Sequence, residues 1–203
     1  MGRSTKAQEL SFSPAEATPP QDHVVQFYDE TVSLVQSAGA YLAGGLLRGC
    51  PAIVIAEERR LPLFQRQLES MGVDVPAALA SRRLILLDAR ETLSRFMVDG
   101  LPDERSFREV LGTLVAGTSE IWHPARLHAY GDMVDLLWAD GHSAAALALE
   151  ELWNDLAHRH GFALFCAYSA NHFKRDEQRA AFDAVCHQHG QIMPIDGARS
   201  MAS

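Results

Sequence analysis

The sequence predicts an α/β protein with an open, mostly parallel β-sheet and helices on both faces. Short apolar runs alternate with longer segments in which apolar residues recur every three or four positions, and this alternation occurs five times. The short runs are apolar almost throughout, as expected for strands that are buried on both faces of a parallel sheet.

Each predicted strand is rich in aliphatic, β-branched or aromatic residues and is followed by helical periodicity. The strands cover residues 23–28, 52–56, 83–88, 126–130 and 162–168. Thr31 can cap the first helix, and Gly49 ends it. Further helices are predicted at residues 61–71, 91–98, 103–116, 134–160 (with a break near residues 140–141) and 177–189.

Composition excludes several classes of protein. The 203 residues are 47% hydrophobic and 22% charged, which is typical of one globular domain. No apolar run approaches the roughly 20 residues of a membrane span, and the N-terminus lacks the order of a secretory signal. Three cysteines without CxxC spacing favour a cytoplasmic protein. The net charge of −8 argues against direct binding to nucleic acid.

The domain is expected to occupy residues 22–173. Residues 1–21 are rich in Ser, Thr, Pro, Glu and Ala and are interpreted as a flexible leader. Residues 174–191 would form a C-terminal helix, and residues 192–203 a flexible tail. These flanks are too short for an output module, so we expect signalling through a separate protein or self-association as a homodimer.

The sequence lacks the motifs of nucleotide binding by a P-loop and of catalysis by a serine nucleophile. A P-loop needs glycine amides and a lysine around the phosphates, but residues 28–31 contain no glycine and two carboxylates. No GxSxG nucleophile motif is present. Cys166 lies within an apolar strand, where a thiol usually behaves as a small hydrophobe. We therefore expect no nucleotide cofactor and no catalytic residue.

The histidines do not predict a metal site. His158 and His160 are two residues apart, as are His187 and His189, so on a helix the members of each pair point away from each other. We interpret all four as solvated helix-end residues that complement the helix dipole.

Ligands of open α/β sheets bind beyond the carboxyl ends of the strands. Tyr28, Tyr130 and Tyr168 end three of the predicted strands, and Asp132 follows soon after one of them. His23 begins the first strand and, five residues from Tyr28, faces the opposite side of the sheet, so the two need not share one site.

Trp153 and Asn154 lie on the long helix before the last predicted strand. Aromatic, histidine and carboxylate side chains together suit a small, partly apolar ligand. Packing in the core is the alternative role for the tryptophan and for the tyrosines.

Several of these stretches resemble the MEDS domain, a sensory domain named for methanogens, methylotrophs and the DcmR regulator. His-Val-Val-Gln-Phe-Tyr at residues 23–28 is similar to its opening motif. Later agreement follows in order at residues 91–97, 130–134, 136–141, 149–154 and 165–168. Departures from the family pattern are Asp132 in place of Glu, Gly141-His142 in place of Gly-Asn, and Ser169 in place of Pro.

The resemblance covers about residues 22–173 and implies a fold related to RecA and KaiC without a working P-loop. It also implies a signalling role in which small molecules such as hydrocarbon derivatives are sensed. The ligand-binding residues that it implies are His23, Tyr28, Tyr130, Asp132, Trp153, Asn154 and Tyr168.

The leading hypothesis is a non-enzymatic sensory domain that binds a small organic ligand and signals to a separate kinase or transcriptional regulator. The alternative is a protein-interaction module that acts on a histidine kinase or anti-sigma-type partner without a small ligand. Its contact surface would be the apolar stripe of Phe182, Val185 and Cys186. An enzyme that uses His23 or a carboxylate as its base ranks third, because no acid and base occur at a spacing that fixes their geometry.

Overall fold

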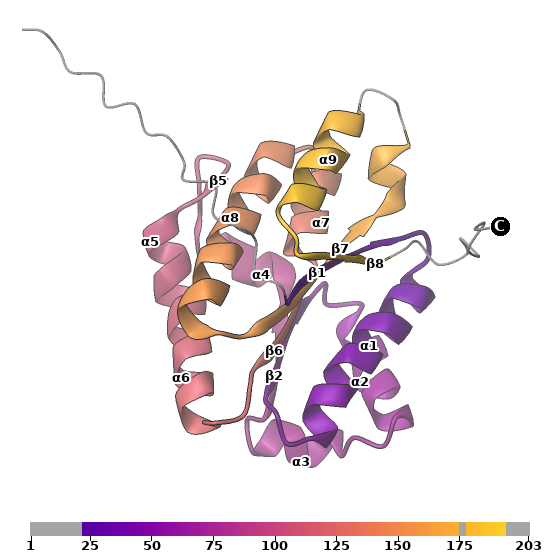
Figure 1. Ribbon diagram of the computed structural model, residues 1–203, viewed down its shortest axis with the longest axis vertical. Helices are drawn as coiled ribbons and strands as arrows, with labels where there is room; N and C mark the ends of the chain where they lie inside the picture. The colour runs from indigo at the N-terminus through magenta and orange to yellow at the C-terminus, as the bar shows by residue number, and fades with distance from the viewer. Residues whose placement is uncertain (1–21, 175–177, 194–203) are drawn as a thin grey trace, which may run out of the picture.

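The computed structural model describes residues 22–174 and 178–193 and confirms the α/β class. Its centre is a six-stranded sheet with the order β3-β2-β6-β7-β1-β8 (Figure 1). Every neighbouring pair in this sheet is parallel. The strands are β1 (His23–Tyr28), β2 (Ala52–Ala56), β3 (Leu84–Asp88), β6 (His128–Gly131), β7 (Ala163–Ser169) and β8 (Gln191–Met193).

Helices cover both faces of this sheet and enclose a hydrophobic core on each (Figure 1). One core lies beneath α1 (Thr31–Leu47), α2 (Leu61–Ser70) and α3 (Val75–Ala80). The other lies beneath α4 (Ala89–Ser94), α5 (Glu104–Phe107), a π-helical turn (Arg108–Gly112), α6 (Thr113–Ile121), α7 (Met133–Ala139), α8 (Ser143–His160), a 3-10 turn (Ala170–Phe173) and α9 (Arg179–His187). Two buried faces explain why the strands are apolar at nearly every position.

Local signals set several helix ends. The side chain of Asp88 accepts a hydrogen bond from the Glu91 amide at the start of α4, and side-chain acceptors of this kind favour helix N-termini. Gly161 ends α8 with a φ of 65°, in the left-handed region. Thr31 is the first helical residue of α1 and Glu30 occupies the cap position, so the predicted cap is one residue late.

The C-terminal strand β8 corrects the predicted tail. Residues 192 and 193 were assigned to a flexible tail, but they belong to β8, whose Gln191 and Met193 pair with Val24 and Gln26 of β1. Three residues are too few to show the alternation by which strands are recognised. The predicted leader and the rest of the tail lie outside the described residues.

A short hairpin also replaces predicted helix. Strands β4 (Met97–Val98) and β5 (Leu101–Pro102) pair in antiparallel fashion. Asp99 and Gly100 between them have φ values of 49° and 82°. Positive φ at both central residues matches a type I′ turn, which favours a hairpin over the predicted continuation of the helix to residue 98.

The connections between strands change face at three places along the carboxyl edge of the sheet. After β1 and β2 the chain continues into helices on one face, whereas after β3, β6 and β7 it continues into elements on the other. Three pairs of neighbours therefore send the chain to opposite faces: β3 and β2, β2 and β6, and β7 and β1. Ligands of open α/β sheets bind at such switch points.

Candidate functional site

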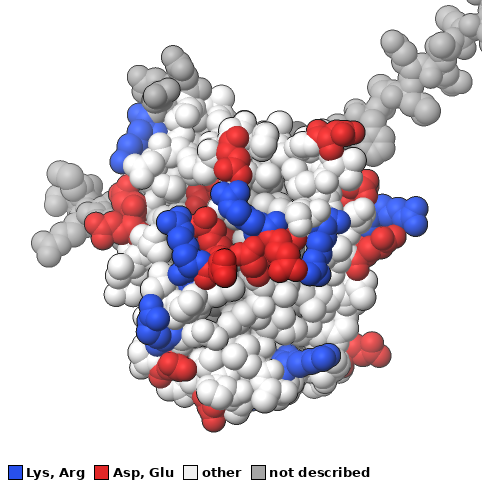
Figure 2. All heavy atoms as spheres, turned by 180° about the vertical axis from the view of Figure 1, so that it is seen from behind, with Lys and Arg blue, Asp and Glu red and all other residues white. Residues whose placement is uncertain are grey.

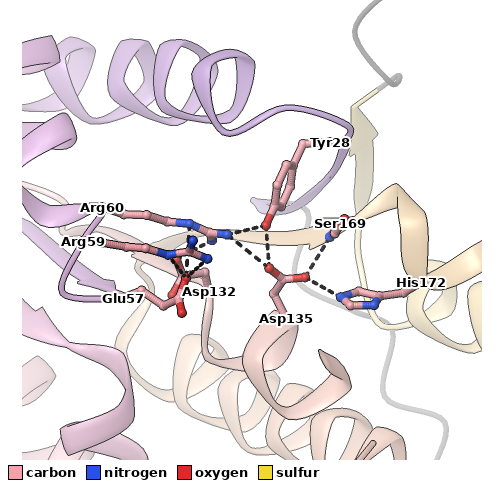
Figure 3. A network of polar contacts seen from close by, with 8 residues as sticks. All are labelled: Tyr28, Glu57, Arg59, Arg60, Asp132, Asp135, Ser169 and His172. Carbon is pink, nitrogen blue, oxygen red and sulfur yellow. Dashed lines mark hydrogen bonds and ion pairs between the residues drawn. The ribbon is translucent and has the colours of Figure 1, made fainter. Parts of the chain in front are cut away.

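Four of the six strands deliver polar side chains to one network at the carboxyl edge (Figure 3). We call it the carboxyl-edge network: Tyr28, Arg60, Asp132, Asp135 and His172. Tyr28 ends β1, Arg60 caps α2 after β2, Asp132 and Asp135 open α7 after β6, and His172 lies in the turn after β7. The network therefore spans two of the three switch points, between β2 and β6 and between β7 and β1.

Short hydrogen bonds join these groups. The Tyr28 hydroxyl donates to Asp135 Oδ2 at 2.5 Å and accepts from Arg60 Nη2 at 2.6 Å. Arg60 Nη1 donates to Asp132 Oδ2 at 2.8 Å. The other oxygen of Asp135 accepts from the Ser169 amide and from His172 Nε2, both at 2.8 Å. Figure 3 shows the side chains converging from opposite sides of the edge.

The pKa values of the two aspartates shift in opposite directions. Asp132 is fully buried, and burial raises its pKa to about 7 although the Arg60 guanidinium acts in the opposite direction. Burial would also raise the pKa of Asp135, but the hydrogen bonds from His172, Tyr28 and Ser169 outweigh it and lower the pKa. Desolvation and the Asp135 charge raise the pKa of Tyr28, so its hydroxyl stays protonated and can donate.

The network keeps unused hydrogen-bonding capacity. Among the described residues, Asp132 Oδ1 and Arg60 Nε are buried without a hydrogen-bond partner. The nearest charge to Arg60 Nε is Glu57 Oε2, at 3.6 Å, and Glu57 is itself hydrogen-bonded by Arg59 at 2.7 Å. Buried polar atoms in this condition are rare in folded proteins and mark places where a further polar group would be stabilised.

A second set of polar side chains lies near the amino end of β1, on the face of the sheet that α8 covers. We call it the histidine cluster: His23, Glu150, Cys166 and His189. His23 Nε2 lies 3.2 Å from Cys166 Sγ and 3.5 Å from Glu150 Oε2. His189 Nε2 lies 3.5 Å from Glu150 Oε1. All four side chains are buried, and none of them belongs to the carboxyl-edge network.

Burial also dominates the ionisation of the histidine cluster. It lowers the pKa of His23 to about 4, against the opposing hydrogen bond to Asn154. It raises the pKa of Glu150 to about 7 and that of the Cys166 thiol well above its usual value. Each shift favours the uncharged form of the group.

The structure divides the predicted ligand-binding residues among three environments. Tyr28 and Asp132 belong to the carboxyl-edge network. His23 belongs to the histidine cluster, and Asn154 and Tyr168 contact its members through hydrogen bonds of 2.7 Å to His23 and 2.9 Å to Glu150.

The remaining two predicted residues pack in the core. Trp153 lies edge-on to Phe107 at 5.4 Å between ring centroids, and Tyr130 lies 4.7 Å from Phe64. The Tyr130 hydroxyl has no hydrogen-bond partner among the described residues. The contacts of these two side chains are therefore those of core packing, the alternative role that the sequence analysis gave them.

The interpretation of His189 as a solvated residue at a helix end is wrong. Its side chain is fully buried, and its ring lies 4.1 Å from the ring of His23, measured between centroids. The helix α9 ends at His187, and the Gly190 amide donates to the His23 carbonyl as the chain enters β8. Pairing with β1 therefore carries His189 inward, which the helical spacing of His187 and His189 does not reveal.

The sequence interpretation missed six members of the two groups: Arg60, Asp135, His172, Glu150, Cys166 and His189. Arg60 and Asp135 each lie within a few residues of a strand end, so a search of each first helical turn would have found them. Glu150 lies in the middle of α8, where only its zero exposure distinguishes it from other helix glutamates.

A groove of about 290 Å³ lies apart from both groups. It runs between α6 and α8, with Gly112 and Leu156 in its lining and an ion pair of Arg108 and Asp155 at 3.1 Å. Nothing in the sequence singled out this groove.

Charged side chains on the rear face form a belt in which basic and acidic groups lie next to each other (Figure 2). Exposed ion pairs of the described residues include Arg59 with Glu57 at 2.7 Å and Arg90 with Asp140 at 2.9 Å. The face in view thus carries mixed charge, whereas a phosphate backbone is bound by a stripe of basic groups. No helix within residues 22–174 and 178–193 has the length and apolarity of a membrane span.

Comparison with known proteins identifies the family of this chain and a solved structure with a similar fold. Residues 22–188 match the family described as MEDS, the MEthanogen/methylotroph, DcmR Sensory domain, and a family of sensory domains indicates a sensory or signalling role. An uncharacterized protein from Pyrococcus horikoshii, crystallised in complex with an unknown peptide, has a similar fold. Its TM-score is 0.57 at 13% identity, over 83% of this chain and 75% of that one. No curated protein is significantly similar in sequence.

Proposed function

The chain belongs to the MEDS family of sensory domains, and from this premise we propose that it is a non-enzymatic, cytoplasmic sensor of a small organic ligand. The carboxyl-edge network is the proposed recognition site. The observation that carries the proposal is a buried network, built from the ends of four neighbouring strands, that spans two switch points and retains unpartnered polar atoms.

The charge of the network favours a neutral or cationic ligand. Glu57, Asp132 and Asp135 contribute three carboxyl groups, against the two guanidinium groups of Arg59 and Arg60. Asp132 Oδ1 offers an acceptor, so the matching ligand group is a hydrogen-bond donor such as a hydroxyl, amide or amine. An anion would be repelled by the acidic side chains.

Aromatic side chains beside the network suit an apolar ligand body. Phe173 follows His172 directly, is half-buried, and lies 5.5 Å from Phe182 and 5.0 Å from Trp138 between ring centroids. A ligand with a polar head at Asp132 and a hydrocarbon body toward Phe173 would use both surfaces.

The second candidate function is a protein-interaction module without a small ligand. The apolar stripe expected as its contact surface packs against the core instead, with Val185 fully buried and Phe182 and Cys186 half-buried. Exposed apolar residues that favour this function are Val98 and Leu101 of the β4–β5 hairpin, which are 54% and 52% exposed. For either function, we propose that the domain signals to a separate kinase or transcriptional regulator.

A thermal-shift screen distinguishes the two functions. The purified chain is tested against small alcohols, amides, amines and halogenated hydrocarbons, with nucleotides as a comparison set. A ligand at 100 times its Kd stabilises the folded state by about 2.7 kcal/mol, so we expect a raised Tm with at least one neutral or cationic compound. Asp132→Asn should reduce the shift, whereas Asp140→Asn, an exposed aspartate, should not.

The absence of any stabilising compound would contradict the sensor function and leave the interaction module. Stabilisation by nucleotides alone would contradict the proposed ligand class.

A further inference from the structure

We propose that the histidine cluster is a binding site for a divalent cation of the zinc type, with His23 Nε2, His189 Nε2, Cys166 Sγ and a Glu150 carboxylate oxygen as ligands. One candidate ligand atom from each of the four residues lies within 4.8 Å of all the others. This site is separate from the carboxyl-edge network and does not depend on its function.

The separations between ligand atoms fit tetrahedral coordination. Bond lengths of about 2.0–2.3 Å place neighbouring ligand atoms of a tetrahedron about 3.3–3.7 Å apart. Three separations are 3.5 Å: His23 Nε2 to Glu150 Oε2, Cys166 Sγ to Glu150 Oε2, and His189 Nε2 to Glu150 Oε1. His23 Nε2 to Cys166 Sγ is 3.2 Å. These four separations involve both oxygens of Glu150, and all four candidate ligand atoms lie within 4.8 Å of one another, so the side chains would move closer together to enclose an ion.

The outer contacts orient both imidazoles for metal binding. His23 Nδ1 faces Asn154 Oδ1 at 2.7 Å, and the amide nitrogen of Asn154 donates to Gln188, which fixes Oδ1 as an acceptor. His189 Nδ1 faces the Val185 carbonyl at 2.7 Å. Both histidines thus carry their proton on Nδ1 and direct the Nε2 lone pair into the cluster. Metal-binding histidines are held in this way by an acceptor on the other ring nitrogen.

One atom of the cluster is left without its natural partner. His189 Nε2 is buried and has no hydrogen-bond partner among the described residues. A fully buried lone pair that receives no hydrogen bond is unfavourable, and a bound cation would supply the missing partner.

Charge and ligand chemistry select the class of ion. Two neutral imidazoles, a thiolate and a carboxylate balance the charge of a divalent cation. Thiolate and imidazole favour Zn²⁺ and related transition metals over Mg²⁺ or Ca²⁺, which prefer oxygen ligands. Four protein ligands in a closed core leave no open position, so the site would be structural or regulatory rather than hydrolytic.

An ion at this site would tie the C-terminal segment to the domain. His23 lies on β1, Glu150 on α8 and Cys166 on β7, whereas His189 lies between α9 and β8. Occupancy would therefore stabilise the docking of residues 178–193, and release of the ion would loosen it.

Cobalt titration of the metal-free chain tests the proposal. Co²⁺ substitutes for Zn²⁺ and reports a thiolate ligand through a charge-transfer band and tetrahedral geometry through its visible bands. We expect both bands to saturate at one Co²⁺ per chain and Zn²⁺ to displace the Co²⁺. Cys166→Ser should abolish the thiolate band, and His189→Gln should abolish stoichiometric binding. Cys186→Ser and His187→Gln are matched controls, because both side chains lie outside the cluster, and they should bind as the wild type does.

Asn154→Ala provides a variant that keeps all four ligands. It should weaken binding by about 10–100-fold, the usual effect of removing an outer-shell partner. Its circular dichroism spectrum shows whether the chain remains folded, and it keeps the proposal testable if Cys166→Ser does not fold.

Hydrogen exchange provides the second measurement. Zn²⁺ should slow amide exchange in residues 178–193 of the wild type and of His187→Gln, but not of His189→Gln. A wild-type chain that binds neither ion, or a cobalt spectrum that Cys166→Ser and His189→Gln leave unchanged, would overturn the proposal.

Discussion

At the scale of single residues, the buried tyrosines differ in whether their hydroxyl groups form hydrogen bonds. Tyr28 and Tyr168 donate to the carboxylates of Asp135 and Glu150. Tyr130 is equally buried, but its hydroxyl has no hydrogen-bond partner among the described residues. Loss of a hydroxyl is costly only where it leaves a buried partner unsatisfied.

This difference predicts opposite outcomes for one chemical change at two positions. Tyr28→Phe deprives both Asp135 and Arg60 of a hydrogen bond and should lower the free energy of unfolding by about 1–3 kcal/mol. Tyr130→Phe removes a hydroxyl that no described residue bonds and should be neutral or slightly stabilising. Urea unfolding of both variants measures the difference. Equal losses would show that the Tyr28 hydrogen bonds contribute no more than packing.

The buried Asp132 predicts a pH dependence of stability. Its pKa is raised to about 7 in the folded chain from 3.8, so a proton binds more tightly to the folded state. The contribution of this carboxyl to stability is full below about pH 4 and is lost as the pH rises through 7.

The wild type should therefore gain stability relative to Asp132→Asn as the pH falls from about 7 to about 4, by at most about 1.4 kcal/mol per pH unit. Chemical denaturation at several pH values measures this difference, in which the other titrating groups cancel. Asp183→Asn, an exposed aspartate on α9, is the control and should show a parallel pH profile. A parallel profile for Asp132→Asn would contradict the raised pKa.

At the scale of elements, α1 packs closely on the sheet through Gly45. A Cβ atom at this position would lie 2.9 Å from the ring of His128. That ring cannot easily move, because it is buried, donates a hydrogen bond from Nδ1 to the Arg126 carbonyl, and lies 5.2 Å from the Tyr41 ring between centroids. The adjacent Gly44 is more open, with Arg48 Nη1 at 3.5 Å as the nearest atom.

Alanine substitutions at the two glycines should therefore have opposite signs. Gly45→Ala should destabilise the chain by about 1–3 kcal/mol through overpacking against β6. Gly44→Ala should stabilise it by about 0.5–1 kcal/mol, because alanine is the better helix former. Thermal unfolding of the pair measures both effects. Stabilisation by Gly45→Ala would mean that α1 can shift away from β6.

At the scale of the whole molecule, the sheet order determines which parts of the sequence meet. The five long strands were predictable because each is a continuous apolar run. The order β3-β2-β6-β7-β1-β8 was not, since strand periodicity carries no information about neighbours. It is this order that brings Arg60 from β2 to Tyr28 of β1, across β6 and β7, and that brings His189 to His23.

The sequence therefore predicted part of the candidate site. Tyr28 and Asp132 were identified from their places near strand ends and from the family resemblance, and His23 and Tyr28 do face opposite sides of the sheet, as their five-residue spacing indicated. Glu150 and His189 were not identified, because their burial comes from tertiary packing and from the unpredicted strand β8.

The central claim is that the carboxyl-edge network is the recognition site of this sensory domain. The most direct measurement is ¹H–¹⁵N NMR of the chain with the compound that stabilises it most in the thermal-shift screen. We predict the largest changes at the Arg60 Nε–H group and at the backbone amides of Asp132, Asp135 and Ser169. Changes confined to the groove between α6 and α8, with the Arg60 signal unmoved, would contradict the claim.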